Sequence, residues 1–466
     1  MFIKRFVGDR AFYRKVLQVA VPIMIQSGIT NFVNLLDNIM VGRLGTESMS
    51  GVSIVNQFVF IFNLMIFGAI SAAGIFTAQY HGQGDMEGIR YTFRFKMVVS
   101  LVSTAIGIGA FLLFDDALIS LFLHGEGVEG NLALTLSEGK DYLKIMLVGL
   151  VPYTVSQVYS STMRETEETV VPMISSVVSV AVNFVLNYVL IFGKLGIPAM
   201  GVKGAAIATV VARFAELSVL LLWGYRHKER CPYLKGALRS LRIPAHLFSR
   251  IAVNGLPLMA NEVFWAIAIM LRNQCYSTRG LDIVAGQNIS STAINVFQVV
   301  WMAIGFSIGI IVGNLLGAGK LEEARDTNRK MMAFSILCSV GMGIIMAISA
   351  FFFPSVYNTT EAARNIATYM LIVSACTMPF SAFAYSAYFT LRSGGMVWVT
   401  LLFDSVYMWS VVLPISFFAA YGTDMSIHWL FLLCQGTEII KVMFGAILVK
   451  RGRWVRQLVA DENLKQ

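Results

Sequence analysis

Charged residues and cysteines are scarce in this sequence. Charged side chains make up only 14% of the 466 residues, whereas hydrophobic ones make up 56%. A soluble core of this length has no room for so much apolar surface, so we expect lipid to cover it. The five cysteines show no CxxC spacing, which gives no support to a disulfide framework or a zinc site.

Sequence motifs of the common enzyme classes are missing as well. The nearest approach to an ATP-binding GxxxxGKS or GxxxxGKT loop is GNLLGAGKL from Gly313, which has the wrong glycine spacing. A match to GxSxG, GFSIG from Gly305, lies inside an apolar run, where small residues usually serve helix packing. The five histidines are isolated from one another and form no HExxH motif. We therefore expect no enzyme activity, no cofactor and no metal-dependent catalysis.

What the sequence does contain is a series of long apolar runs. A helix needs about 20 such residues to cross about 30 Å of hydrocarbon, and twelve runs are long enough. Six lie in the first half, at 16–41, 52–79, 94–114, 141–162, 170–193 and 201–225. Six lie in the second half, at 249–275, 284–315, 328–353, 364–391, 396–420 and 426–449. The predicted fold class is an all-α membrane protein with twelve transmembrane helices.

Basic residues are unevenly distributed between the predicted loops. The connector 226–250 carries seven lysines and arginines, whereas the loop 115–139 carries none and has five acidic residues. The positive-inside rule therefore places both termini and the connector in the cytoplasm, and 115–139 outside. The positive residues that give the net charge of +9 are concentrated in such loops, where membrane topology explains them. We therefore expect no nucleic-acid partner. The first apolar run is too long for a signal peptide, which predicts a retained first span in a multi-pass protein of the cell (inner) membrane.

Two parts of the chain repeat each other at an offset of 235 residues. VAVPIM around Pro22 matches NGLPLM around Pro257, and Gly82 in AQYHGQGDMEGIR matches Gly317 in VGNLLGAGKLEEAR. Such repeats are typical of transporters in which one bundle moves against the other. We predict two homologous six-helix bundles, 1–225 and 249–466, around a central cavity, with a cytoplasmic connector at 226–248.

Polar residues within the predicted spans of the first half mark a candidate ion site. An ionisable group in the bilayer costs roughly 2.5–3.5 kcal/mol on insertion scales, so Asp37 needs a reason to be there. At 1.5 Å per residue, four polar residues fall about 7–15 Å below the outer boundary: Asp37, Asn183, Asn187 and Thr209. Their oxygens suit a proton or a hard cation, so the only metal we expect is Na⁺ at Asp37. The amides and the hydroxyl are also explained as interhelical hydrogen bonds, worth about 0.6 kcal/mol each.

Two acidic residues in the second half are further candidates. Glu262 lies near the midplane of the seventh span, and Asp404 lies in the inner half of the eleventh. We predict that Glu262 binds substrate, together with Asn34 of the first span. Asp404 is either functional or paired with Arg164 or Arg392. Two further pairs are spaced i,i+3 and are predicted to neutralise themselves on one helix face: Arg213 with Glu216, and Glu438 with Lys441.

Several segments resemble the multidrug and toxic compound extrusion family, over nearly the whole chain. They are NLLDNIMVGRLG, AQYHGQGD, GNLLGAGKLEEAR and NFVLNYVLIFGKLGIPAMGVKGAAIAT. The resemblance implies a V-shaped, cation-coupled antiporter that exports cationic amphipathic drugs. In one branch of that family an aspartate, an asparagine, an aspartate and a threonine form an ion site, which correspond here to Asp37, Asn183, Asn187 and Thr209. Asn187 departs from that pattern by lacking a carboxylate, which leaves H⁺ and Na⁺ both open as the coupling ion.

A second branch of the same family uses a glutamate on helix 7 and an aspartate on helix 10. Glu262 resembles the former, but the tenth span contains no acid. The runner-up function is a lipid-linked oligosaccharide flippase of the same superfamily, which would need several arginines in its cavity. A non-transporting receptor or scaffold is the remote alternative. The partners we expect are small organic cations and the lipid bilayer, with the protein a monomer.

Overall fold

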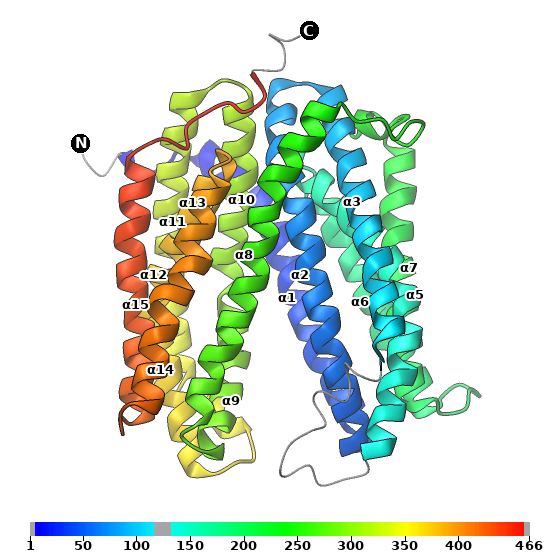
Figure 1. The fold of residues 1–466 in the computed structure, drawn as a ribbon, viewed down its shortest axis with the longest axis vertical. Coiled ribbons are helices and arrows are strands. Elements are labelled where there is room, and N and C mark those ends of the chain that lie inside the picture. Colours follow the sequence, from blue (N-terminus) through cyan, green and yellow to red (C-terminus); the bar gives the residue numbers. More distant parts are fainter. Residues whose placement is uncertain (1–4, 116–131, 461–466) are drawn as a thin grey trace. The chain divides into compact units, whose positions relative to one another are not determined.

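The computed structural model describes residues 5–115 and 132–460, and every regular element in these ranges is helical. The first half of the chain contains α1 (Arg10–Gly42), α2 (Thr46–Gln83), α3 (Met86–Leu113), α5 (Leu132–Glu165), α6 (Val170–Phe192) and α7 (Gly201–Arg226). The second half contains α8 (Ala245–Ser277), α9 (Leu281–Phe297), α10 (Val299–Gly317), α11 (Leu321–Ser349), α12 (Glu361–Ser393), α13 (Val397–Leu401), α14 (Leu413–Tyr421) and α15 (Ile427–Lys450). Figure 1 shows these helices in sequence colours.

The helices account for all twelve predicted spans. Eleven helical stretches within the described ranges are long and apolar enough to cross a membrane. The twelfth span is α5, whose 34 residues also suffice in length, although its first half carries charges such as Lys140 and Asp141. The prediction of an all-α membrane protein is therefore confirmed.

Two spans are less regular than the sequence predicted. The run 284–315 is divided into α9 and α10, which meet at Gln298. The run 396–420 consists of α13, two π-helical segments (Leu402–Val406 and Met408–Val412) and α14. A π-helical turn contains an extra residue, which changes the face on which the following side chains lie. Hydropathy does not register this change, because every residue involved remains in an apolar run.

The chain forms two compact units that do not follow the midpoint of the sequence. Unit 1 comprises residues 1–24, 78–85 and 251–466, and unit 2 comprises 25–77 and 86–250. The first part of α1 thus packs in unit 1, where Val16 and Val19 join a buried cluster with Ile308 and Leu316. The assignment of 1–225 and 249–466 as functional bundles remains a prediction.

In unit 1 the repeated glycines allow two helix ends to cross closely. A Cβ atom on Gly82 would lie 1.8 Å from the backbone oxygen of Asn314, and one on Gly317 would lie 1.9 Å from that of Gln79. Gln79 and Asn314 are themselves 235 residues apart, so the contact is reciprocal between the repeats. Gly84 and Gly319 follow with positive φ angles of 80° and 73°, which glycine adopts without strain.

The C-terminal segment after α15 crosses this end of unit 1 (Figure 1). The guanidinium of Arg456 donates to the carbonyl oxygens of Gly394 and Gly395 at 2.6 and 2.9 Å. Gln457 donates to the carbonyl of Gly317 at 2.6 Å, and the backbone N–H of Leu458 donates to Gln79 Oε1 at 2.6 Å. These bonds tie the ends of α2, α10 and α12 together.

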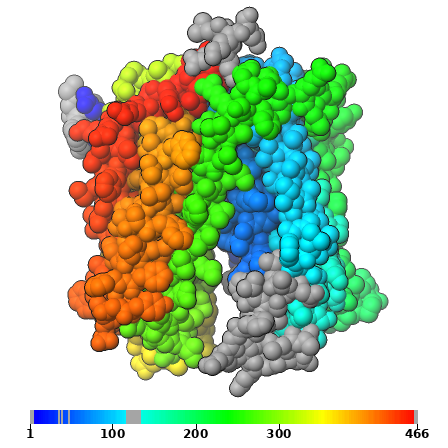
Figure 2. All heavy atoms as spheres, viewed as in Figure 1, coloured from blue at the N-terminus to red at the C-terminus, as the bar shows by residue number. Residues whose placement is uncertain are grey.

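In unit 2, α6 and α5 both pack along α7, and the basic connector folds back onto α3. Arg90 donates to the carbonyls of Pro232 and Tyr233, and Arg94 donates to that of Ala237 at 2.7 Å. The connector is therefore an ordered part of unit 2. In unit 1, α13 and α14 lie beside α8, as the orange and green surfaces in Figure 2 show, and the indole of Trp409 donates to the Phe264 carbonyl.

Candidate functional site

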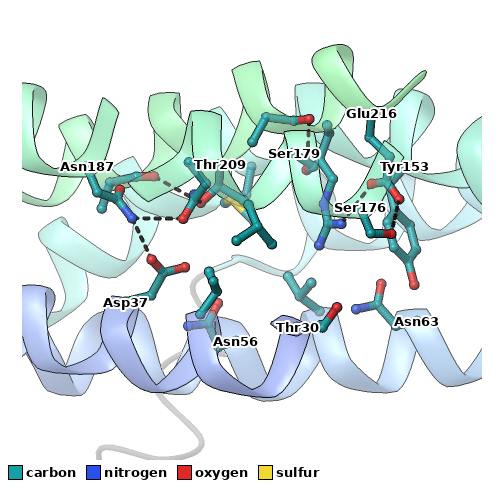
Figure 3. Close-up of a pocket in the computed structure, with 18 of the residues that line it drawn as sticks. Thr30, Asp37, Asn56, Asn63, Tyr153, Ser176, Ser179, Asn187, Thr209 and Glu216 are labelled. Atoms are coloured by element: carbon teal, nitrogen blue, oxygen red, sulfur yellow. Dashed lines mark hydrogen bonds and ion pairs between the residues drawn. The ribbon is translucent and has the colours of Figure 1, made fainter. Parts of the chain in front are cut away.

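A cavity of about 450 Å³ lies within unit 2, between α1, α2, α5, α6 and α7. This volume falls in the range of pockets that hold small molecules, roughly 300–1,000 Å³. Figure 3 shows its polar side chains in two groups, with Asp37 and Asn187 at one end and Glu216 and Tyr153 at the other.

At the first end, α6 brings two asparagines to the carboxylate of α1. Asn187 Nδ2 donates to Asp37 Oδ1 at 2.5 Å and to Asn183 Oδ1 at 3.0 Å (Figure 3). Asn183 Nδ2 in turn donates to Thr209 Oγ1 at 3.2 Å. The four residues that the sequence placed at one depth are therefore in one hydrogen-bonded chain.

Helical geometry explains this convergence. Asn183 and Asn187 are four residues apart, so both amides lie on the same face of α6, which packs along α7. Both side chains are buried, at 4% and 1% exposure, which removes them from bulk solvent. The amide oxygen of Asn187 is buried without a hydrogen-bond partner among the described residues. A buried acceptor without a donor is costly, and a bound cation would satisfy it.

The second end of the cavity was not predicted as a site. Arg213 and Glu216 form the expected pair, with Arg213 Nη1 at 3.3 Å from Glu216 Oε2, but both line the cavity. The Arg213 guanidinium also lies 4.7 Å from the centre of the Tyr153 ring. The i,i+3 spacing correctly predicted the pair, but it carries no information about which way the pair faces. The cavity thus contains two carboxylates and one guanidinium.

Unit 1 has a polar cluster of its own around α8. The hydroxyl of Tyr388 donates to Glu262 Oε1 at 3.3 Å and accepts from Asn261 Nδ2 at 3.3 Å. Asn261 Nδ2 also donates to Asp404 Oδ2 at 3.1 Å. Glu262 and Asp404, predicted separately, therefore belong to one network. Asn261, at its centre, was not predicted, although the repeat offset of 235 pairs it with the polar Gln26.

Asp404 has a different ion-pair partner from those predicted. Lys441 Nζ lies 2.6 Å from Asp404 Oδ1, although the sequence suggested Arg164 or Arg392 for Asp404 and Glu438 for Lys441. The i,i+3 interpretation of Glu438 with Lys441 was wrong, because α15 packs against the π-helical segment and brings Asp404 to the lysine. Packing between helices therefore decides which acid pairs with the lysine.

Some predicted features lie outside what the structure describes. The side chain of Asn34, a predicted substrate contact, is one of them, as are residues 116–131 of the predicted outer loop. Within the described ranges there is no group of three or more histidine, cysteine or acidic side chains that could hold a metal ion.

Comparison with known proteins agrees with this architecture. Residues 22–189 and 257–418, one segment from each repeat, match the MatE family. A probable multidrug resistance protein NorM of Thermotoga maritima is 24% identical over 463 residues, covering 97% of this chain and 96% of that protein. Multidrug resistance protein PmpM of Pseudomonas aeruginosa is 25% identical over 433 residues, covering 89% and 85%.

Solved structures share the fold at low sequence identity. An outward-facing multidrug resistance MATE family transporter of the MOP superfamily superimposes with a TM-score of 0.84 at 17% identity, covering 97% of this chain and 98% of that one. A MOP superfamily transporter from Pyrococcus furiosus, described as having a binding pocket of reverse polarity, gives 0.82 at 18%, with the same coverage. Since the family match covers more than half of the sequence, this chain belongs to the MatE family of membrane transporters.

Proposed function

We propose that this protein exports small organic cations in exchange for H⁺ or Na⁺, by alternating access. The observation that carries this proposal is Asp37 on a cavity wall, beside a buried amide oxygen of Asn187 that has no hydrogen-bond partner among the described residues. The names of the relatives NorM and PmpM, which are multidrug resistance proteins, support a drug-like substrate.

The coupling step follows from the hydrogen bonds of Asp37. As a carboxylate, Asp37 accepts from Asn187 Nδ2 and attracts a cation. Once protonated, Asp37 keeps its carbonyl oxygen as an acceptor and gains an O–H donor, for which the buried Asn187 amide oxygen is an available acceptor. Sodium would instead draw on oxygens of Asp37, Asn187 and Thr209. Either ion changes the contacts that hold α1 to α6, which is what coupling between two conformations requires.

The proposal also includes the oligomeric state, the membrane and the orientation of the protein. We propose that it acts as a monomer in the cell (inner) membrane, with both termini in the cytoplasm. It would need no cofactor, because the ion gradient supplies the free energy for export. Substrates would be amphipathic cations, attracted by carboxylates in a site of low dielectric constant.

Transport by the purified protein in proteoliposomes tests this function. A fluorescent organic cation should accumulate when a Na⁺ or proton gradient is imposed in the direction opposite to its movement. The gradient that drives accumulation identifies the coupling ion. If neither gradient drives movement of several such cations, the proposed antiport is wrong.

We expect Glu262→Gln to weaken binding of monovalent organic cations by about tenfold, or about 1.4 kcal/mol. The carboxylate of Glu262 offers charge attraction, whereas glutamine keeps its size and its hydrogen bond with Tyr388. Equilibrium titration of the purified variant with several fluorescent cations measures the change. Glu361→Gln, at the exposed start of α12, is the matched control and should leave affinity unchanged. Equal affinities for wild type and Glu262→Gln would assign Glu262 to packing.

We also expect the connector and the predicted outer loop to lie on opposite sides of the membrane. Single cysteines would replace Lys235, which is exposed in the connector, and Gly127 of the outer loop, after the native cysteines are removed. A membrane-impermeant maleimide added to intact cells should label position 127 and not position 235, because basic loops remain inside. The reverse pattern would invert the topology, and permeabilised cells provide the control for accessibility.

A further inference from the structure

The polar clusters of the two units share one position of the repeat and draw on the same spans of each half. Gln26 and Asn261 are 235 residues apart (261 − 26), and each lies four residues after the proline of its helix, Pro22 or Pro257. Each contacts a serine on the fifth span of its half, and a charged residue of the sixth span completes each cluster. The serines are Ser176 and Ser405, and the charged residues are Glu216 and Lys441.

In unit 2 the cluster links two neutral side chains, Gln26 and Ser176, to an arginine and a glutamate. Gln26 Nε2 donates to Ser176 Oγ at 2.8 Å, and Ser176 Oγ lies 3.4 Å from Glu216 Oε1. Arg164 also donates to Gln26 Oε1 at 3.2 Å. The sixth-span residue here is an acid that pairs with Arg213. Arg213 also acts electrostatically on the Asp37 carboxylate in the same cavity, but no described basic side chain lies at ion-pair distance from Asp37.

In unit 1 the sixth-span residue of the cluster is a lysine that forms an ion pair with an acid. Ser405 Oγ donates to Asn261 Oδ1 at 2.8 Å, and Asp404, next to Ser405, accepts from Lys441 and Asn261 through its two oxygens. The Lys441 and Asp404 side chains are only 10% and 16% exposed. The ammonium therefore lies where a free cation would have to bind this carboxylate.

Other charged groups near Asp404 come from two further helices and from α15. Glu262 of α8 and Arg392 and Tyr388 of α12 interact electrostatically within this cluster, and Glu438 acts on Lys441. None of them replaces the direct contact between Lys441 and Asp404. Glu262 accepts a hydrogen bond from the neutral hydroxyl of Tyr388 and forms no ion pair with Lys441.

We propose that Lys441 is a built-in counter-ion that permanently occupies the carboxylate site of unit 1, so that only the Asp37 site takes a coupling ion from solution. This inference rests on the proposed function, in that it assigns the coupling ion to unit 2. The variant Lys441→Gln, which lacks the ammonium, distinguishes this inference from a purely structural role of the lysine. With Lys441→Gln, Asp404 loses its ammonium partner, and a monovalent cation from solution, Na⁺ or H⁺, should take its place.

Thermal unfolding in detergent tests this inference without any transport measurement. All proteins carry Asp37→Asn, so the unit 2 site contributes no ion response, and choline chloride replaces NaCl at constant ionic strength. The parent protein, which carries Asp37→Asn alone, should have an unfolding midpoint that does not depend on Na⁺ at alkaline pH. Addition of Lys441→Gln should create an upward shift of at least about 2 °C with Na⁺, because a ligand that binds the folded state stabilises it. A shift that appears on acidification instead identifies the proton as the cation.

The double change Asp404→Asn with Lys441→Gln is the control, and it should lose the new ion response. Recovery of folded Lys441→Gln only in NaCl or at lower pH also supports the inference. A folded Lys441→Gln variant with no response to either ion would overturn it, as would an ion response of the parent that Asp404→Asn removes. If Lys441→Gln never folds, whether or not the double variant does, the lysine is structural and the inference is wrong. Because export is not measured, these outcomes are independent of whether the proposed antiport is correct.

Discussion

Asp37→Asn is expected to reduce ion-driven export of organic cations by about 5- to 150-fold, which corresponds to typical coupling free energies of 1–3 kcal/mol. Asparagine keeps the size of the side chain and a contact with Asn187, but it carries no charge and does not titrate. The ion would then no longer favour one conformation over the other. Initial rates in proteoliposomes under the driving gradient measure the loss.

Binding measurements separate coupling from folding in this variant. Asp37→Asn should remain monodisperse and should still bind a fluorescent cation, because Glu262 in unit 1 is intact. Asn187→Asp is the companion variant, and restoring a second carboxylate beside Asp37 should strengthen the dependence of transport on Na⁺. Export by Asp37→Asn at the wild-type rate under the same gradient would show that another group couples the ion.

Gly317→Ala is expected to destabilise the folded protein by about 3 kcal/mol, the upper end of the usual cost of overpacking. The added methyl group would lie 1.9 Å from the backbone oxygen of Gln79, so α2 and α10 would have to separate at their crossing. That movement would also strain the bond from Gln457 to the Gly317 carbonyl. The unfolding midpoint in detergent and the yield of monodisperse protein measure the effect.

Gly341→Ala is the matched control for this prediction. Gly341 lies on the exposed face of α11, and a Cβ there would meet nothing within 4 Å. Alanine is favoured over glycine inside a helix by up to about 1 kcal/mol, so this variant should be as stable as the wild type or more so. Equal unfolding midpoints for Gly317→Ala and Gly341→Ala would mean that α2 and α10 accommodate the added methyl group without loss of stability.

The end of the cavity that contains Asp37 was predictable, because the sequence features that mark it lie within single helices. Asp37 stands out as an unpaired acid in an apolar run, and the spacing of Asn183 and Asn187 on one helix face follows from helical geometry. Their depth follows from the rise per residue, so the contact with Thr209 was expected. The opposite end of the cavity was missed because Arg213 and Glu216 already neutralise each other along α7.

By itself, the sequence determined that the protein lies in a membrane, with twelve spans in two repeats. These properties depend on the length of apolar runs and on an offset of 235, both of which are read along one chain. Only the tertiary structure decided which helix faces meet. It placed 78–85 in unit 1 through the crossing at Gly317, and it gave Lys441 to Asp404 instead of Glu438. The physical reason is that a side chain on a helix reaches partners on its own turn and on a neighbouring helix alike, and only packing between helices selects one.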